Sequence, residues 1–240
     1  MKNFIFIVCF NFLFFSSFAQ NPINQLNDKG EKIGPWVGYY SASNNKRYEG
    51  FFENDKPVGQ FIYFSEKGHV SAKINFINDS ISSSLMYHDN GNMMAKGKFI
   101  NKLKVGKWFT YRSSGDLLNI FNYNNGKLDG NQYMYYPANK ETQQSKLMEE
   151  YSCVYGLKHG QWNQYYELGT TKAKGNYLNG KKEGLFEYYF LNGSLDKKGR
   201  FVDDKKNGLW YFYNEDTDQM DKIIYKMGQV KKSKINKGAQ

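Results

Sequence analysis

Three histidines are the side chains of this chain most suited to metal binding or proton transfer: His69, His88 and His159. A zinc site needs several Cys, His, Asp or Glu side chains that converge on one point. None of the three has such a partner at ligand spacing, and each falls at a different place in the repeat described below. We interpret them as solvated histidines of turns or strand edges, and we predict no metal and no cofactor.

The acidic pairs Glu149-Glu150 and Asp203-Asp204 could act in hydrolysis only in a particular arrangement. Glycosidase chemistry needs two carboxylates that face each other across a substrate, and nothing in these adjacent pairs indicates that. We interpret both pairs as solvated. The sequence therefore predicts no catalytic residue and a protein that is not an enzyme.

The first 19 residues are typical of a secretory signal peptide. Lys2 precedes an apolar run from Phe4 to Phe15, and small residues follow at Ser17 and Ala19. This order matches the charged, apolar and small-residue regions of a signal, with cleavage after Ala19. The run is shorter than the roughly 20 residues of a membrane-spanning helix. We expect export to the periplasm, the outer membrane surface or the medium.

Cys153 is the one cysteine expected to remain after cleavage, because Cys9 leaves with the signal peptide. An internal disulfide is then impossible. A nucleophilic cysteine needs an accessible, electropositive site, whereas Cys153 stands where other repeats carry Phe or Tyr. We interpret it as a small buried apolar side chain.

The chain is basic, with a formal charge of +10 that becomes +9 without Lys2. A basic exported protein tends to associate with anionic surfaces such as lipid headgroups or acidic polysaccharides. Nucleic acid would suit the charge equally well, but export makes it an unsuitable partner, so we predict no nucleic-acid binding.

The repeat is a Gly-x-aromatic motif that recurs about every 24 residues. Two units depart from it, since one begins with serine and another has Gln132 in the aromatic position. The eight units begin at Gly34, Gly59, Ser82, Gly106, Gly130, Gly160, Gly184 and Gly208.

Two columns of aromatic residues run through the units. The fifth residue after each start is aromatic in all eight: Tyr39, Phe64, Tyr87, Tyr111, Tyr135, Tyr165, Tyr189 and Tyr213. A second column, later in each unit, contains Phe52, Phe76, Phe99, Tyr123, Cys153, Tyr177, Phe201 and Tyr225.

Each unit therefore reads as a β-hairpin. Turn signals separate its two strands, as at Asn90-Gly91, Ser114-Gly115, Leu168-Gly169 and Asn192-Gly193. Because side chains of a strand alternate between faces, the aromatics two and five residues after the start should point to opposite sides. We predict an all-β fold, an elongated single antiparallel sheet of about eight hairpins.

The units resemble the MORN repeat in its bacterial variant form. The pattern Gly-x-Trp/Phe-x-x-Tyr-Tyr, then Asn-Gly, then Gly-x-Tyr is clearest from Gly160 to Gly193, and the resemblance extends from Gly34 to about Val230. It implies the fold given above. Members are described as scaffolds, membrane-associated modules and protein-binding surfaces, and many bacterial ones carry an antitoxin-like label.

The turns that lead into each new unit are rich in lysine, and in a stacked sheet they should lie along one edge. That lysine edge is a candidate docking site for an anionic surface, with ordinary solubilising turn residues as the alternative. Its members are Lys56, Lys102, Lys104, Lys127, Lys158, Lys181, Lys182, Lys205 and Lys206.

Tyrosines on one side of the sheet form a second candidate surface, able to stack on a sugar or anchor a protein partner. Packing within the sheet is the alternative. The candidate residues are Tyr135, Tyr165, Tyr189 and Tyr213, and Tyr133 and Tyr211 share their side.

We divide the chain into a signal peptide (1–19), a flexible leader (20–33), a repeat domain (34–230) and a basic tail (231–240). A polar insertion at 137–148 should protrude as a loop from one edge. We expect a non-enzymatic exported binding or scaffold protein for an envelope component or a protein partner. An antitoxin- or immunity-like protein with one specific partner is the alternative, and the open sheet edges could also pair with a second copy.

Overall fold

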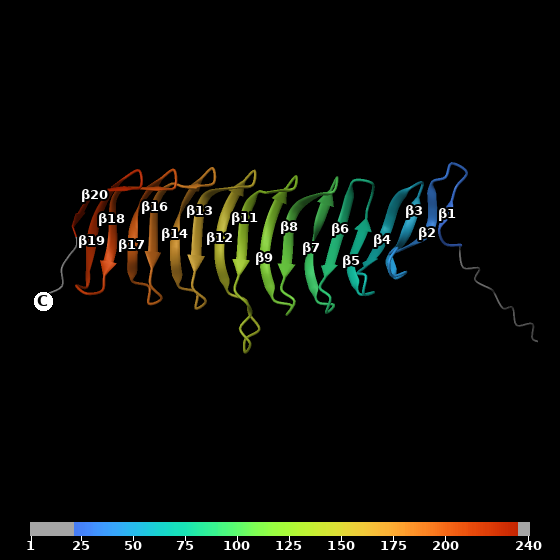
Figure 1. The fold of residues 1–240 in the computed structure, drawn as a ribbon, viewed down its shortest axis with the longest axis horizontal. Helices are drawn as coiled ribbons and strands as arrows, with labels where there is room; N and C mark the ends of the chain where they lie inside the picture. Colours follow the sequence, from blue (N-terminus) through green and yellow to red (C-terminus); the bar gives the residue numbers. More distant parts are fainter. Residues whose placement is uncertain (1–21, 235–240) are drawn as a thin grey trace, which may run out of the picture.

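The computed structural model describes residues 22–234, so the predicted signal peptide lies outside the described part of the chain. This part forms one open antiparallel sheet of 20 strands, a single layer without a helix, as Figure 1 shows. The predicted fold class is confirmed. The strands are β1 (Gln25–Leu26), β2 (Lys32–Tyr39), β3 (Lys46–Glu53), β4 (Lys56–Phe64), β5 (Val70–Phe76), β6 (Ile81–Tyr87), β7 (Met93–Ile100), β8 (Leu103–Tyr111), β9 (Leu117–Asn124), β10 (Lys127–Leu128), β11 (Gly130–Tyr135), β12 (Leu147–Val154), β13 (Leu157–Tyr165), β14 (Thr171–Leu178), β15 (Lys181–Lys182), β16 (Gly184–Tyr189), β17 (Leu195–Val202), β18 (Lys205–Asn214), β19 (Gln219–Lys226) and β20 (Gln229–Lys234).

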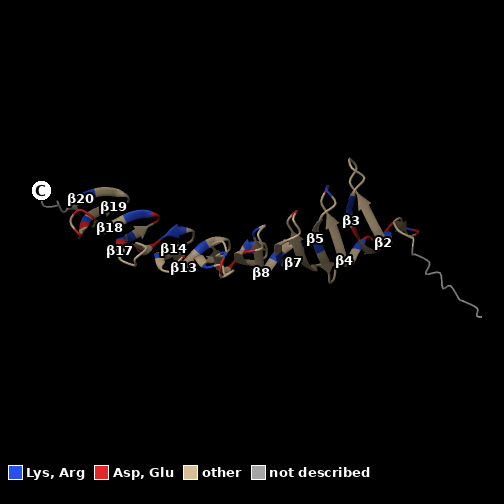
Figure 2. Ribbon diagram, turned by 90° about the horizontal axis from the view of Figure 1, so that it is seen from below, with Lys and Arg blue, Asp and Glu red and all other residues tan. Residues whose placement is uncertain are grey.

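Strands pair with their neighbours in sequence, and the two-residue strands β10 and β15 only extend β11 and β16 toward the edge. The sheet reaches past both predicted ends of the repeat domain. Strand β1 lies within the predicted leader and pairs with β2, and β20 includes the first residues of the predicted tail. Figure 2 shows that the sheet twists along its length, because strands at the two ends are seen at different angles.

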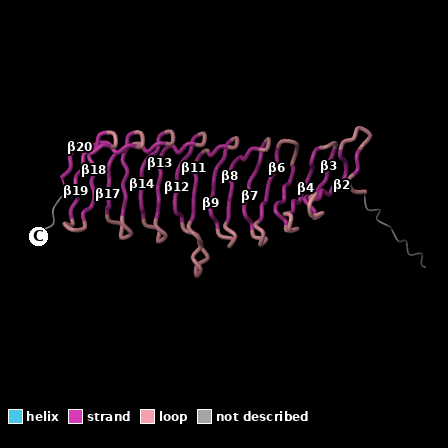
Figure 3. The backbone as a smooth tube through the Cα atoms, viewed as in Figure 1, coloured by secondary structure: helices cyan, strands magenta, loops and turns pink. Residues whose placement is uncertain are grey.

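Two kinds of turn occupy the two long edges of the sheet (Figure 3). Except at the described turn between β5 and β6, which has no residue with positive φ, turns between units have two successive residues with positive φ, for example Asp203 and Asp204 at 47° and 65°. This is the type I′ geometry that suits tight hairpins. Turns within units contain a glycine such as Gly193, whose N–H donates to the Phe190 carbonyl at 2.9 Å, except in the first, fifth and eighth units. The four turn signals predicted from sequence are all turns of this second kind.

The starting glycine of a unit matters through its backbone. Gly208 has a φ of +77°, a conformation that side chains with a Cβ rarely adopt, and the pairing of β17 with β18 shifts register beside it. Ser82 is not among the described residues with positive φ, and the register between β5 and β6 runs without a shift. The serine therefore removes a bulge from the third unit.

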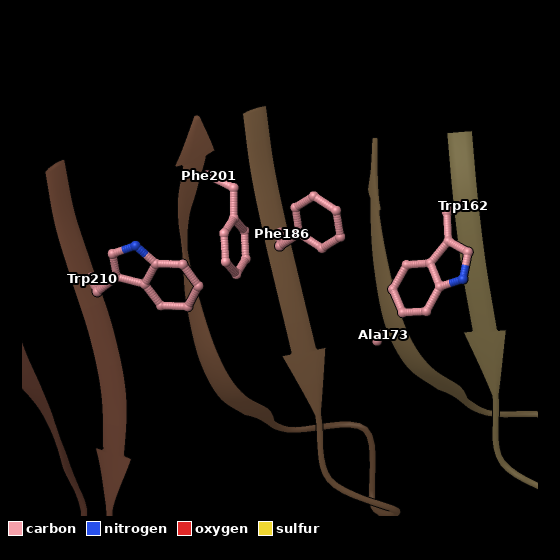
Figure 4. Packing of buried hydrophobic residues seen from close by; sticks show 5 residues of the cluster. All are labelled: Trp162, Ala173, Phe186, Phe201 and Trp210. Carbon is pink, nitrogen blue, oxygen red and sulfur yellow. The ribbon is translucent and has the colours of Figure 1, made fainter. Parts of the chain in front are cut away.

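One face of the sheet, here called the ring face, carries interlocked aromatic rings. Phe201 lies between Phe186 and Trp210, with ring centroids 5.0 Å from each and planes inclined at 81° and 85° (Figure 4). Phe186 and Trp210 are fully buried although no second layer covers them. Rings of neighbouring hairpins therefore supply the core within the sheet itself.

Large rings are accommodated because the preceding strand carries glycine beneath them. A Cβ at Gly199 would lie 2.1 Å from the Trp210 ring, and one at Gly175 would lie 2.4 Å from Phe186. Such separations cannot occur without displacing the ring. The same relation joins Gly50 to Phe61 and Gly97 to Trp108.

A second set of contacts joins units along the edge of the within-unit turns. The Tyr166 hydroxyl donates to the carbonyl of Tyr189 at 2.8 Å, and Tyr136 does the same to Tyr165 at 2.9 Å. His88 occupies the corresponding place, and its Nε2 donates to the Tyr111 carbonyl at 3.0 Å. His88 is thus a half-buried link between units, not the solvated histidine that we expected.

Candidate binding surfaces

The residues with metal-binding or nucleophilic side chains are dispersed or buried in the described part of the chain. Within residues 22–234, no group of three or more His, Cys, Asp or Glu side chains could hold a metal ion. No helix in that range is long and apolar enough to cross a membrane. Cys153 is 2% exposed, and burial raises the pKa of its thiol despite the nearby Lys158. This placement matches a small buried side chain in the second aromatic column.

The structure separates the predicted lysine edge into two groups. Four of its members fold over the ring face: Lys104, Lys158, Lys182 and Lys206. The Lys206 Nζ lies 4.7 Å from the centroid of Trp210 and 5.0 Å from that of Tyr225. Burial, with a further contribution from Lys197, lowers the pKa of Lys206. These four ammonium groups cover rings of the core. That role was not predicted, although all four lysines stand two residues before the start of a unit.

The other five lysines of the edge are exposed: Lys56, Lys102, Lys127, Lys181 and Lys205. Lys56 pairs with Asp79, and Lys181 pairs with Asp203 at 3.0 Å. No ion pair within residues 22–234 involves the remaining three. The charge of the edge is therefore partly neutralised by ion pairs. Lys102, Lys127 and Lys205 are its exposed lysines without an ion pair in the described residues, and we call them its uncommitted lysines.

The opposite side of the sheet, here called the tyrosine face, holds the four predicted tyrosines, all half-buried. The Tyr165 hydroxyl donates to Glu150 at 2.7 Å, and the Asn163 amide donates to the same oxygen at 3.1 Å. Burial, followed by the contact with Glu150, raises the pKa of Tyr165 to about 12. Burial also raises the pKa of Tyr135, with smaller contributions from Tyr133 and Glu150. Tyr135 and Tyr165 thus belong to one cluster around the Glu150 carboxylate. The pair Glu149-Glu150 is therefore half-buried and hydrogen-bonded, not solvated as we expected.

The other two tyrosines of this face have different surroundings. Lys174 lies 5.5 Å from the Tyr189 ring and pairs with Glu187 at 3.0 Å. The Tyr213 hydroxyl donates to Asp218 at 2.8 Å. Each of the four rings therefore already has a partner within the chain, while part of its surface faces solvent.

The predicted insertion protrudes from the edge of the within-unit turns, between β11 and β12 (Figure 1). A hollow of about 600 Å³ lies on its side toward Ser114, and another of about 560 Å³ lies on its side toward Leu168. The Ala138 N–H donates to Asp116 at 3.0 Å and joins the loop to the neighbouring hairpin.

A further hollow, of about 540 Å³, was not anticipated from the sequence. It lies over the third unit, and Phe76 and Phe99 contribute to its lining. The signal was present where the second and third units begin. Pro57 and Ser80 stand there in the position at which five other units have a ring-covering lysine.

A family model described as MORN repeat variant matches residues 158–179 and 182–203. The resemblance read from the sequence is thereby confirmed, and the matched segments are two neighbouring units of the sheet. No curated protein matches the chain significantly.

Proposed function

We propose that this chain, a protein built from MORN-variant repeats, is an exported, non-enzymatic binding scaffold whose lysine edge docks an anionic surface of the cell envelope. MORN repeats in general bind proteins or membrane lipids. The observation that carries the proposal is the row of exposed, uncommitted lysines Lys102, Lys127 and Lys205 along one edge.

The geometry of the sheet supports multivalent contact. Each hairpin advances the sheet by two strand spacings, about 10 Å, so turns of successive units meet an extended surface at regular intervals. Each basic side chain near an anionic membrane surface contributes about 1 kcal/mol, and that contribution falls with salt. The affinity of the edge would therefore come from the number of lysines in contact with the surface and not from any single lysine.

Binding to vesicles tests this proposal. The mature chain should sediment with vesicles that contain phosphatidylserine and not with phosphatidylcholine alone, and rising salt should release it. Replacing Lys102, Lys127 and Lys205 by glutamate should weaken binding at least about tenfold.

The matched control replaces Lys98, Lys107 and Lys222, three exposed lysines of the tyrosine face, by glutamate. Both triple variants change the net charge equally. If both triple variants bound vesicles equally weakly, net charge alone would explain the binding. Vesicle binding that did not weaken as salt rose would also overturn the proposed docking edge.

The second candidate is an antitoxin- or immunity-like protein that binds one protein partner. The observation that favours it is the prearranged cluster of Tyr165, Asn163 and Glu150. An interface built on aromatic side chains should persist in high salt. In-cell crosslinking of the tagged mature chain, followed by mass spectrometry, should then capture one dominant protein, and Tyr165→Ala should lose it.

A further inference from the structure

The second aromatic column has a regular cover that is missing in one place. Wherever a unit has a lysine two residues before its start, that lysine lies over the column ring. Its Nζ is 5.0 to 5.3 Å from the ring centroid at Phe52, Tyr123, Tyr177, Phe201 and Tyr225. In the second and third units the corresponding residues are Pro57 and Ser80. Among the described rings of the column, Phe76 and Phe99 have no cationic group over them.

The two uncovered rings stand as the covered ones do. Phe76 meets Phe61 edge to face at 5.3 Å and 83°, and Phe99 meets Trp108 at 4.8 Å and 72°. Phe201, which Lys182 covers, meets Phe186 of its own unit at 5.0 Å and 81° and Trp210 of the next unit at 5.0 Å and 85°. The face of the ring that accepts a lysine elsewhere is therefore presented in the same way here.

The space that those lysines would fill is the hollow of about 540 Å³. Ile74, Phe76 and Phe99 line it, together with Pro57, where a lysine would project. Its rim bears the carboxylates of Asp55 and Asp79 and the ammonium groups of Lys56 and Lys102. The two carboxylates and the two ammonium groups balance, and Lys56 pairs with Asp79. The rim therefore carries no net positive charge that would exclude a cation.

We propose that this hollow binds a lysine or arginine side chain presented by a protein partner, in the place that the chain's own lysine takes in other units. The alkyl stem would pack on Ile74 and Pro57. The cationic head would lie over the faces of Phe76 and Phe99, whose quadrupoles attract a positive charge, with the Asp55 carboxylate at the rim. The site shares Lys56 and Lys102 with the lysine edge at its rim, but it differs from that edge in recognising a cation on the ring faces of Phe76 and Phe99.

Three probes of equal chain length test the chemical class: n-hexylammonium, n-hexanol and hexanoate. Each is titrated into the full mature chain while the methyl NMR signals of Ile74 and Ile81 are followed. Hexylammonium should shift these signals in a saturable manner, at least about tenfold more tightly than the other two. Equal binding of hexanol or hexanoate, or no binding of hexylammonium, would overturn the proposal.

The variant Ser80→Lys places the missing lysine in the chain itself. It should leave the melting temperature no lower than that of the wild type and weaken hexylammonium binding at least about tenfold. Ser114→Lys, an exposed substitution at the opposite edge, is the matched control and should bind as the wild type does. If folded Ser80→Lys bound hexylammonium as tightly as the wild type does, the probe would bind outside the hollow and the proposal would be overturned. Vesicle binding reports separately on the lysine edge, so failure of one proposal is distinguishable from failure of the other.

Discussion

The units that begin at Gly184 and Ser82 occupy equivalent places in the sheet but bury different side chains. In the first, Phe186 is fully buried above Gly175. In the second, Ser84 takes the place of the ring and pairs across the strands with Ile74. The large side chain is therefore Phe186 on β16 in the first case and Ile74 on β5, the strand that precedes Ser84, in the second.

In this exchange a large side chain, Ile74, accompanies the small side chain of Ser84. Gln132, the other small substitute for a ring, follows a strand that carries Phe121 where the regular units have glycine. Trp162 is the exception, since Tyr151 lies beneath it. Its indole N–H donates to the side chain of Glu149 at 2.6 Å, whereas that of Trp210 donates to the backbone of Arg200. In this sheet a ring therefore packs over glycine, or a small side chain packs beside a large one. Where both residues are large, as at Tyr151 and Trp162, the indole N–H turns to a different acceptor.

The largest effect is expected from Trp210→Ala in a regular unit. The indole is fully buried and meets Phe201, Phe212 and Tyr225. Removing such a ring from a core costs about 3–5 kcal/mol, measurable as the free energy of unfolding in urea. Trp36→Ala, at the half-buried end of the sheet, should cost clearly less. Equal losses would mean that burial along the sheet is more uniform than the structure indicates.

Alkaline pH should weaken the regular ring face next. Burial raises the pKa of Tyr188 to about 12 and, together with Cys153 and Glu149, that of Tyr151 to about 12. The unfolded phenol titrates near pH 10, so the unfolded chain loses protons that the folded chain retains. Their contribution to stability is complete below pH 10 and is lost as the pH rises through 12. Melting temperatures should fall over that window while tyrosinate absorbance rises cooperatively; simple titration near pH 10 without unfolding would contradict this.

The repeat could be predicted from the sequence because its signals are local. Glycine-bearing turns and aromatic columns recur with a fixed period, and a hairpin forms from contacts close in sequence. The division of the lysine edge into two groups was not predicted. Lys205 and Lys206 are neighbours in sequence, but the first side chain is exposed to solvent and the second covers the ring face. The hollow at Phe76 was missed for a different reason. It depends on Pro57 and Ser80 together, in two successive units, and either residue alone is typical of ordinary variation between repeats.

A double-mutant cycle converts the irregular unit toward the regular one. Ser84→Phe alone should cost about 1–3 kcal/mol, because Ile74 occupies the space that the ring needs. Adding Ile74→Gly should recover part of this loss, with a coupling energy of about 0.5–3 kcal/mol. Urea unfolding of the four proteins gives the coupling. Additive costs would show that the exchange of volume between the two strands is a coincidence of sequence.

Ser84→Ala should produce the smallest change, and in the opposite direction. The Ser84 hydroxyl is buried without a hydrogen-bond partner in the described structure, whereas the buried Gln132 amide accepts from the Asn122 N–H at 2.9 Å and donates to the Gly130 carbonyl at 3.0 Å. An unpaired buried polar group costs stability, so its removal should raise the free energy of unfolding by up to about 1 kcal/mol. Gln132→Leu is the matched comparison and should lower stability by about 1–3 kcal/mol, because it leaves the Asn122 N–H unpaired. If Ser84→Ala were destabilising instead, the hydroxyl would have a partner in solution, and the small-over-large arrangement would be held by polarity as well as volume.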